Sequence, residues 1–209
     1  MNPIHVLIVD DHAMVREGLK VLLQPLEYVA IVGVAATGAE ALAAARQHHP
    51  DVVLLDINLP DMSGIDVCQQ LAAAQPGIKV LALTTFNEKL YVTRMMQAGA
   101  AGYVLKNALP EELAEAITKV FAGKKFFSEE VQSLLLQAPA EIAATPLLTR
   151  REKEVLAAIA EGHTSQHIAD TLCVSLLTIE THRRNLQEKL NLRSLAELIL
   201  YAVRKGLIA

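Results

Sequence analysis

Carboxylate side chains follow two apolar, β-branched runs in this 209-residue chain. Asp10 and Asp11 come directly after Ile4–Val9, and Asp56 comes directly after Val52–Leu55. If these runs are parallel strands, their carboxyl ends meet at one edge of a sheet, where such sheets bind ligands. Three acids gathered at one edge would repel one another unless a cation joined them. Oxygen ligands of this kind suit Mg²⁺, so the sequence predicts a magnesium site.

Two further polar residues follow apolar runs later in the chain. Thr84 supplies a hydroxyl after Val80–Leu83, and Lys106 supplies an ammonium group after Gly102–Leu105. A hydroxyl and a cation that face a metal-bound carboxylate suit an anion such as a phosphoryl group. An acid at the end of a strand is also a common helix N-cap, and Thr84 or Lys106 alone would be unremarkable. The five residues together favour a phosphoryl-binding site.

The elements that must position these residues alternate along residues 1–123. Short apolar runs alternate with segments of helical period, which is typical of a doubly wound α/β domain with a parallel sheet. Five strands are predicted, at Ile4–Val9, Val29–Val34, Val52–Leu55, Val80–Leu83 and Gly102–Leu105. Five helices are predicted between and after them, at about Ala13–Leu23, Ala39–His48, Ile65–Ala74, Glu88–Ala98 and Pro110–Phe121.

The alternation stops after Gly123. Residues 124–146 are expected to form an interdomain segment, with a short helix at about Glu129–Leu136 followed by a proline-containing linker. Residues 147–209 contain no strand candidate and predict a second, smaller, all-α domain. Its first helix opens with a capping box at Thr149 and Glu152, and a fourth helix covers about Leu195–Lys205.

The second and third helices of this smaller domain predict a helix-turn-helix. A short helix at about Ser165–Leu172 is followed closely by a longer one at about Leu177–Leu190, which carries basic residues. In a helix-turn-helix the second helix enters the major groove of DNA. A solvated helix in an ordinary bundle remains the alternative. His182 is not expected to bind metal, because no ligand residue lies four positions away on either side.

Composition restricts the classes of function. The chain has a net charge of −4 and 52% hydrophobic residues, as globular proteins do. Acidic residues outnumber basic ones in residues 1–123, and the reverse holds after residue 148, which permits binding to nucleic acid. The two cysteines, Cys68 and Cys173, lack metal-site spacing and are expected to be reduced thiols. No signal peptide or membrane span is apparent, so we expect a cytoplasmic protein with no membrane contact.

The strand-end motifs resemble the signature of the receiver domain of bacterial two-component response regulators, which is flavodoxin-like. The motifs are Val9-Asp10-Asp11-His12, Val53–Pro60, Leu83-Thr84 and Gly102–Lys106. The resemblance implies that Asp56 is the phospho-acceptor. It also implies that Asp10, Asp11, Asp56 and the backbone carbonyl of Asn58 hold Mg²⁺, that Thr84 and Lys106 bind the phosphoryl oxygens, and that Tyr103 changes rotamer on phosphorylation. An ordinary tyrosine packed at the sheet edge is an equally good interpretation of Tyr103.

The C-terminal motifs resemble the LuxR-type DNA-binding domain. They include Leu148–Leu156, Ile168-Ala169, Thr178–His182 and Lys189-Leu190. With the receiver, the whole chain resembles a response regulator of the NarL/FixJ family. This implies a partner sensor histidine kinase, a homodimer on activation and binding to double-stranded promoter DNA. The implied base contacts are Glu180, Thr181 and Arg184, and the implied neighbours of phosphates are Thr164, Ser165, Gln166, Thr178 and Arg183.

The sequence departs from the family pattern at several positions. Thr85 stands where the family usually has Ala, which leaves the lifetime of the phosphorylated form open. Glu180 replaces the usual Lys, and Thr164–His167 replace Ser-Asn-Lys-Glu. These changes remove positive charge, so we expect weak nonspecific DNA affinity and greater reliance on dimerisation.

Two other functions compete with a phosphorylation-controlled transcription regulator. An aspartyl-phosphate phosphohydrolase would also place Asp56 at a strand end, but such enzymes usually need an acid two residues later, where this chain has Asn58. We therefore do not expect an enzyme, beyond self-phosphorylation and self-dephosphorylation. A regulator that has lost phosphorylation and acts through protein contacts or constitutive DNA binding is disfavoured by the complete set of five site residues, but Glu180 leaves a version with weak DNA binding open.

Overall fold

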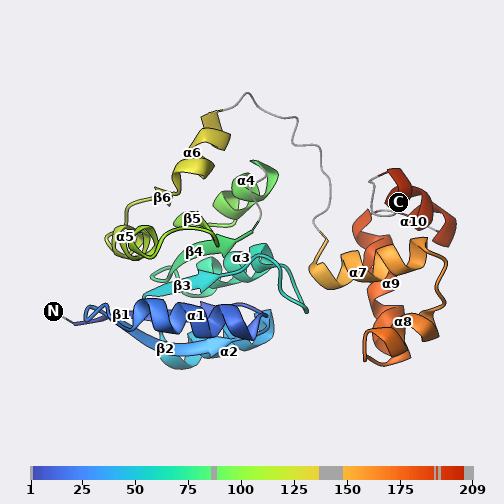
Figure 1. Cartoon of the computed structure of the whole chain (residues 1–209), viewed down its shortest axis with the longest axis horizontal. Coiled ribbons are helices and arrows are strands. Elements are labelled where there is room, and N and C mark those ends of the chain that lie inside the picture. The colour runs from blue at the N-terminus through green and yellow to red at the C-terminus, as the bar shows by residue number, and fades with distance from the viewer. Residues whose placement is uncertain (1, 86–88, 137–147, 191, 193, 205–209) are drawn as a thin grey trace. The chain divides into compact units, whose positions relative to one another are not determined.

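The computed structural model describes residues 2–85, 89–136, 148–190, 192 and 194–204 (Figure 1). Contacts divide the chain into two compact units, Met1–Ile142 and Ala143–Ala209. No helix within the described ranges is long and apolar enough to cross a lipid bilayer.

The first unit contains a parallel sheet with strand order β2-β1-β3-β4-β5-β6. Its strands are β1 Ile4–Val9, β2 Val29–Ala35, β3 Val52–Leu55, β4 Lys79–Thr84, β5 Gly102–Leu105 and β6 Phe126–Phe127. The expected doubly wound α/β class is confirmed, with one strand more than the predicted five. Sequence reasoning missed β6 because two residues are too few to show the alternation by which strands are recognised.

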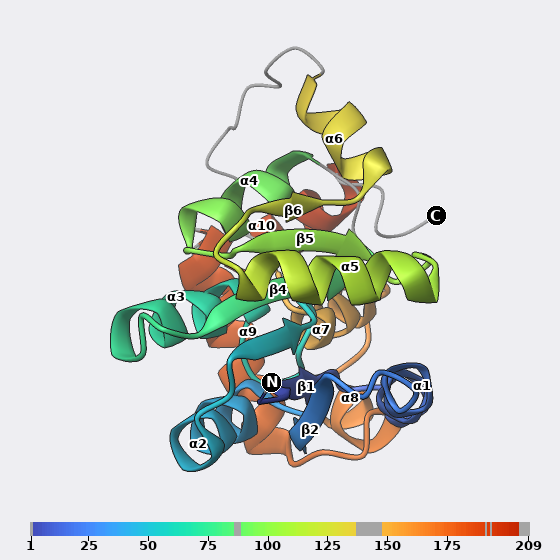
Figure 2. The same cartoon turned by 90° about the vertical axis from the view of Figure 1, so that its left-hand side faces the viewer.

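Helices cover both faces of the sheet (Figure 2). One face carries α1 (Ala13–Leu23) and α5 (Pro110–Phe121), and the other carries α2 (Gly38–His48), α3 (Gly64–Ala74) and α4 (Lys89–Gln97). In α5, Leu113, Ala116, Ile117 and Val120 are buried at helical spacing. They pack against the buried side chains of β1, β3 and β4 in one apolar core. The central strands are mainly apolar, as expected for parallel strands buried on both faces; the exceptions lie near the strand starts, at His5 of β1 and Lys79 of β4.

The segment after α5 stays attached to the first unit. Phe127 of β6 pairs with Tyr103 of β5, and the Ser128 N–H donates to the Tyr103 carbonyl at 3.1 Å. The following helix α6 (Glu129–Leu136) buries Val131 completely and lies against α4. Thus residues 126–136, expected in the interdomain segment, pack on the sheet domain. The linker predicted after them falls at residues outside the described ranges.

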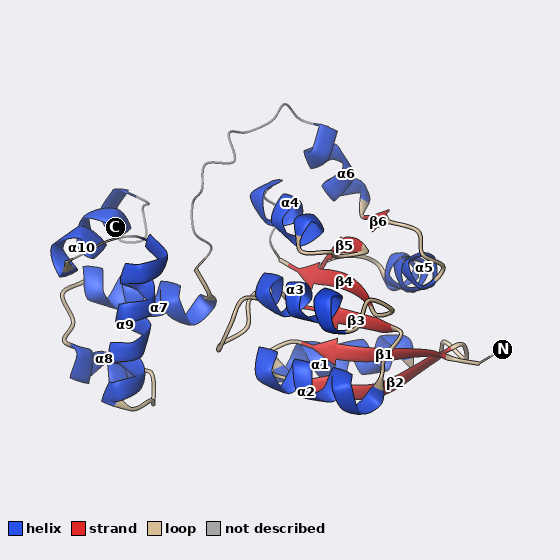
Figure 3. Ribbon diagram, turned by 180° about the vertical axis from the view of Figure 1, so that it is seen from behind, coloured by secondary structure: helices blue, strands red, loops and turns tan. Residues whose placement is uncertain are grey.

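The described residues of the second unit form helices joined by loops, with no strand among them (Figure 3). It consists of α7 (Arg150–Ala160), α8 (Ser165–Thr171), α9 (Leu176–Leu190) and α10 (Leu195–Arg204). The predicted capping box is present: the Thr149 hydroxyl accepts the Glu152 N–H, and the Glu152 carboxylate accepts the Thr149 N–H. Residues of all four helices form its small core: Val155, Leu156, Ile159, Ile168, Ala169, Ile179, Leu186, Leu198 and Ala202.

Candidate functional site

The sheet brings the predicted carboxylates together at the carboxyl ends of β1 and β3. The Asp56 N–H donates to the Val9 carbonyl at 2.9 Å, and the Asp10 N–H donates to the Ala35 carbonyl at 3.1 Å. These bonds continue the strand ladders one residue past the strands and so fix both backbones. Asp10 is 1% exposed and Asp56 is 3% exposed, which is unusual for acidic residues unless they are paired.

A lysine directly after β5 joins the two buried acids. The Lys106 ammonium lies 2.6 Å from Asp10 Oδ2 and 2.7 Å from Asp56 Oδ2. The Lys106 N–H donates to the Thr84 carbonyl at 2.9 Å, which ties the end of β5 to the end of β4. Two carboxylates therefore share one cation in a partly dry site, where electrostatic interactions are stronger than in water.

Burial and charge set the protonation equilibria of the site. Burial raises the pKa of the Asp56 carboxyl above its usual value, although the nearby Lys106 ammonium opposes this shift. Burial acts on the pKa of Lys106 in the opposite sense, but Asp56 and Asp10 outweigh it, so the pKa of Lys106 is raised. The lysine thus stays charged near two acids, and Asp56 is less acidic than a surface aspartate.

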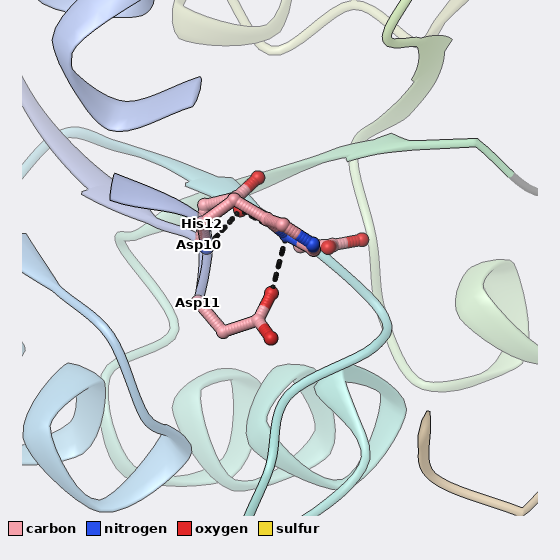
Figure 4. Close-up of side chains that lie close together, drawn as sticks. Asp10, Asp11 and His12 are labelled. Carbon is pink, nitrogen blue, oxygen red and sulfur yellow. Dashed lines mark hydrogen bonds and ion pairs between the residues drawn. The ribbon is translucent and has the colours of Figure 1, made fainter. Parts of the chain in front are cut away.

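Asp11 and His12 are more exposed than Asp10 and Asp56, and the His12 ring lies next to the carboxylates of Asp10 and Asp11 (Figure 4). His12 Nδ1 lies 2.7 Å from Asp11 Oδ1 and 3.3 Å from Asp10 Oδ1. The His12 N–H also donates to Asp10 Oδ1 at 2.9 Å, at the start of α1. One ligand atom from each of Asp10, Asp11, His12 and Asp56 lies within 4.8 Å of the others, so this group could hold a metal ion.

The remaining predicted residues lie beside this cluster. Asn58 follows Asp56 by two residues, is partly buried, and forms a bridge to Ser63 across a tight loop. Its backbone hydrogen bond to the Asp56 carboxyl favours the ionised acid. Thr84 and Tyr103 are completely buried at the end of β4 and within β5.

Sequence reasoning missed three residues that support the site. Arg16 Nη1 donates to the Asp10 carbonyl at 2.6 Å, and His12 was part of a motif without an assigned role. Gly64 begins α3 so close to the acceptor strand that a Cβ there would lie 2.1 Å from the Asp56 carbonyl oxygen. A glycine in a strand-to-helix loop is the only sequence signal for this close approach, and it does not identify the partner.

In the second unit, the predicted DNA-contacting residues lie on α8 and α9. The Thr164 hydroxyl caps α8 by accepting the His167 N–H, and Gln166 is exposed in the first turn of that helix. Arg183 Nη1 lies 2.5 Å from Ser165 Oγ, which links α9 to α8, and 3.4 Å from Glu180 Oε1. Thr178 lies in the first turn of α9, with its hydroxyl 2.7 Å from that of Ser175.

The exposed side of α9 carries the predicted base contacts. Ile179 and Leu186 are completely buried, whereas Glu180 and Arg184 are exposed and Thr181 is partly exposed. At about 100° per residue, Thr181 and Arg184 lie on the side of the helix opposite to the buried pair, and Glu180 lies on the adjoining flank. The helix can therefore present these three side chains together to a partner.

Comparison with known proteins assigns both units to described families. Residues 6–118 match the response regulator receiver domain, and residues 146–202 match the bacterial regulatory proteins of the luxR family. The chain is 41% identical to the response regulator GacA of Pseudomonas aeruginosa, over 98% of each chain. It is 35% identical to the oxygen regulatory protein NreC of Staphylococcus epidermidis, over 97% of this chain and 98% of that one.

Solved structures show the same likeness. RcsB of Salmonella typhimurium, a response regulator studied for its DNA interaction, matches 98% of this chain and 100% of its own at 28% identity and a TM-score of 0.61. An RcsB–DNA complex matches 97% of this chain and 98% of its own at 27% identity and a TM-score of 0.62.

Proposed function

This chain belongs to the NarL/FixJ family of two-component response regulators, and we propose that phosphorylation of Asp56 switches its binding to DNA. The family pairs a receiver domain with a LuxR-type DNA-binding domain, and a member of it is a DNA-binding transcription regulator, not a classical enzyme. The observation that carries the proposal is the position of Asp56. It is a buried carboxylate that shares the Lys106 ammonium with Asp10.

The site chemistry supports Asp56 as the acceptor. An oxygen of Asp56 attacks the phosphorus of a phosphohistidine on the partner kinase and the new P–O bond replaces the P–N bond. The histidine leaves as neutral imidazole, with its leaving nitrogen protonated by solvent water. A carboxylate attacks a negatively charged phosphoryl group only when the added charge is neutralised. The Lys106 ammonium already lies 2.7 Å from Asp56 Oδ2 and can supply one positive charge beside the transferred group.

Asp10, Asp11 and Asp56, with the backbone carbonyl of Asn58, would hold Mg²⁺. Their donor set fits this ion, since the three side chains offer carboxylate oxygens within 4.8 Å of one another. When bound, Mg²⁺ supplies further charge neutralisation for the transferred phosphoryl group. The His12 ring lies 2.7 Å from Asp11 Oδ1, so it would compete with the ion for that oxygen.

Thr84 and Tyr103 would transmit the change. Thr84 ends the strand next to Asp56 and, with Lys106, would bind the phosphoryl oxygens. Tyr103 pairs through its backbone with β6, so movement at Tyr103 would reach the segment that leads into α6. The phosphoryl group adds negative charge and hydrogen-bond acceptors at Asp56, and so would shift the receiver domain toward one of two conformations.

The DNA contacts would come from α8 and α9 of a dimer. Glu180, Thr181 and Arg184 would face base edges, and Thr164, Ser165, Gln166, Thr178 and Arg183 would lie near phosphates. The solved relatives include two RcsB dimers bound to DNA, which supports a dimer here as well. Arg184→Ala should weaken specific binding by about 1–3 kcal/mol in a titration on a selected operator, and unchanged affinity would remove Arg184 from the base contacts.

Labelling tests the acceptor. Wild-type protein treated with acetyl phosphate and Mg²⁺ should gain one phosphoryl group by intact-mass measurement, and Asp56→Asn should gain none. Asp66→Asn, which changes an exposed aspartate on α3, is the matched control and should label as the wild type does. Labelling of Asp56→Asn at another residue would refute the assignment.

Sedimentation tests the switch. The wild type with Mg²⁺ and beryllofluoride, which stands in for the phosphoryl group, should form a dimer, and Asp56→Ala should remain a monomer under the same conditions. If the two proteins sediment alike, dimerisation is not controlled through Asp56.

A further inference from the structure

We propose that Leu177, in the first turn of α9, contacts the C5-methyl group of a thymine and thereby contributes to base specificity. The inference rests on the DNA-binding function proposed above. It adds a residue that the family resemblance did not suggest, at a position where the side chain is 76% exposed.

The start of α9 fixes the position of Leu177. The Ser175 hydroxyl accepts the Thr178 N–H at 3.1 Å, and the Ser175 carbonyl accepts the Ile179 N–H at 3.3 Å. This N-cap makes Leu176 and Leu177 the first two residues of the helix. In helix-turn-helix proteins, the N-terminal residues of the second helix are the ones that contact base edges.

Leu177 lies on the same side of α9 as the proposed base contacts. At about 100° per residue, Leu177, Thr181 and Arg184 fall within roughly 60° of one another around the helix. The completely buried Ile179 and Leu186 lie on the opposite side. A helix that docks through Thr181 and Arg184 therefore carries Leu177 to the DNA, one turn nearer its N-terminus.

The neighbouring Thr181 extends the apolar surface. Its hydroxyl donates to the Leu177 carbonyl at 2.9 Å, so this hydrogen atom is already used within the helix. Thr181 then offers its methyl group and an acceptor oxygen. Leu177 and the Thr181 methyl form an apolar strip, one helical turn long, beside the exposed Arg184.

The chemistry of the major groove selects the base. Thymine alone presents a methyl group there, whereas the other bases offer hydrogen-bond donors and acceptors. A leucine side chain can neither neutralise a phosphate nor hydrogen-bond to a base, and it would cover polar edges of guanine, adenine or cytosine without replacing their bonds to water. Contact with thymine is the arrangement in which burial of Leu177 is favourable.

Thymine-to-uracil replacement tests the contact. Full-length protein with Mg²⁺ and beryllofluoride is used to select duplexes from a random library, and each thymine of the selected site is then replaced by deoxyuridine, which lacks only the methyl group. We expect one position in each half-site at which replacing thymine by deoxyuridine weakens wild-type binding about three- to fivefold, which is the effect of one buried methyl group. Replacement in both half-sites should weaken it roughly tenfold or more.

Two leucine variants assign the effect to a side chain. Leu177→Ala should bind the thymine and deoxyuridine duplexes equally, because the partner of the methyl group is gone. Leu176→Ala is the matched control: it changes the adjacent leucine, 44% exposed and about 100° away around the helix, and should keep the preference for thymine.

Three results would overturn the inference. They are a selected site in which no deoxyuridine weakens binding, a thymine preference that survives Leu177→Ala, and a preference lost only in Leu176→Ala. Failure to select any duplex would overturn the proposed DNA binding itself and the inference with it. The deoxyuridine measurement on wild-type protein needs no variant, so misfolding cannot imitate its result.

Discussion

Replacement of Lys106 by methionine should separate the structural and chemical roles of its ammonium group. The ammonium lies 2.6 Å from Asp10 and 2.7 Å from Asp56, and both carboxylates are almost completely buried. Methionine retains much of the length of the lysine side chain, but it leaves two neighbouring acids without their shared cation.

The size of the effect follows from burial. Removal of one partner from a fully buried ion pair costs about 3–5 kcal/mol. The Lys106 side chain is 14% exposed, and Asp56 can take up a proton, so a smaller loss of about 2–4 kcal/mol in the free energy of unfolding is expected without Mg²⁺. For a unit of this size, that loss lowers Tm by roughly 6–15 °C.

Mg²⁺ should recover much of this loss without restoring phosphoryl transfer. The ion would replace the missing positive charge beside Asp10 and Asp56. A ligand present at a concentration ten times its Kd stabilises the folded protein by about 1.4 kcal/mol. The stabilisation by Mg²⁺ should be larger in Lys106→Met than in the wild type, because no ammonium competes for the acids. Labelling by acetyl phosphate should still fall by about 10²–10³-fold, the usual loss when one charge-stabilising group is removed.

Scanning calorimetry of the full chain in EDTA and in Mg²⁺ measures these stabilities. Lys119→Met is the matched control, because Lys119 pairs with Glu115 on the surface, where such pairs contribute less than about 1 kcal/mol. The reasoning fails if Lys106→Met in EDTA is no less stable than Lys119→Met. It also fails if Mg²⁺ stabilises the wild type and Lys106→Met equally.

Three shorter predictions concern other parts of the chain. Glu180→Lys should raise nonspecific DNA affinity and steepen its dependence on salt by about one ion, and an unaltered slope in a salt titration would place residue 180 away from DNA. Burial lowers the pKa of His182 in the folded protein, although Glu152 opposes the shift. The stability that neutral His182 contributes is therefore complete above its unfolded pKa of about 6.5 and is lost as the pH falls through the lowered, folded pKa. Calorimetry between pH 5 and 8 should therefore show a shallower acid loss for His182→Gln, and equal slopes would contradict this. Burial also raises the pKa of Cys68 to about 12, so a thiol reagent at pH 8 should modify only the exposed Cys173 before denaturation and both cysteines afterwards.

The positions of the site residues could be predicted because parallel sheets obey simple rules. Strands recognisable as apolar runs end at a common edge, so Asp10, Asp56 and Lys106 could be expected near one another before any distance was known. The bounds of β1, β3 and β5 agree with the prediction to the residue. The runs are apolar apart from His5 in β1, and a polar side chain follows each of them. The local sequence thus determines where each strand ends, and the parallel topology of the sheet determines that the residues at these ends lie at one edge.

Contacts between segments distant in the sequence could not be predicted in this way. The approach of Gly64 to the Asp56 carbonyl depends on how α3 enters the sheet, and no local pattern encodes that distance. The attachment of β6 and α6 to the first unit depends on two residues of pairing with β5, which is too short to produce periodicity. Both features are products of tertiary packing, which propensity and pattern do not describe.

A side-chain contact also changes the interpretation of the charge on α9. From the sequence, Glu180 places a negative charge on a helix that faces DNA, and counting charges predicts a loss of affinity. In the structure, Arg183 lies 3.4 Å from Glu180 and 2.5 Å from Ser165, so the carboxylate has a cation beside it. The pair is weak, because Glu180 is 51% exposed and Arg183 is 29% exposed, and a phosphate can compete for the arginine. Arg183 thus offsets part of the negative charge of Glu180, so the expected loss of DNA affinity is smaller than counting charges suggests. Glu180→Gln, which removes the negative charge without adding a positive one, should recover part of the gain expected for Glu180→Lys in the same salt titration.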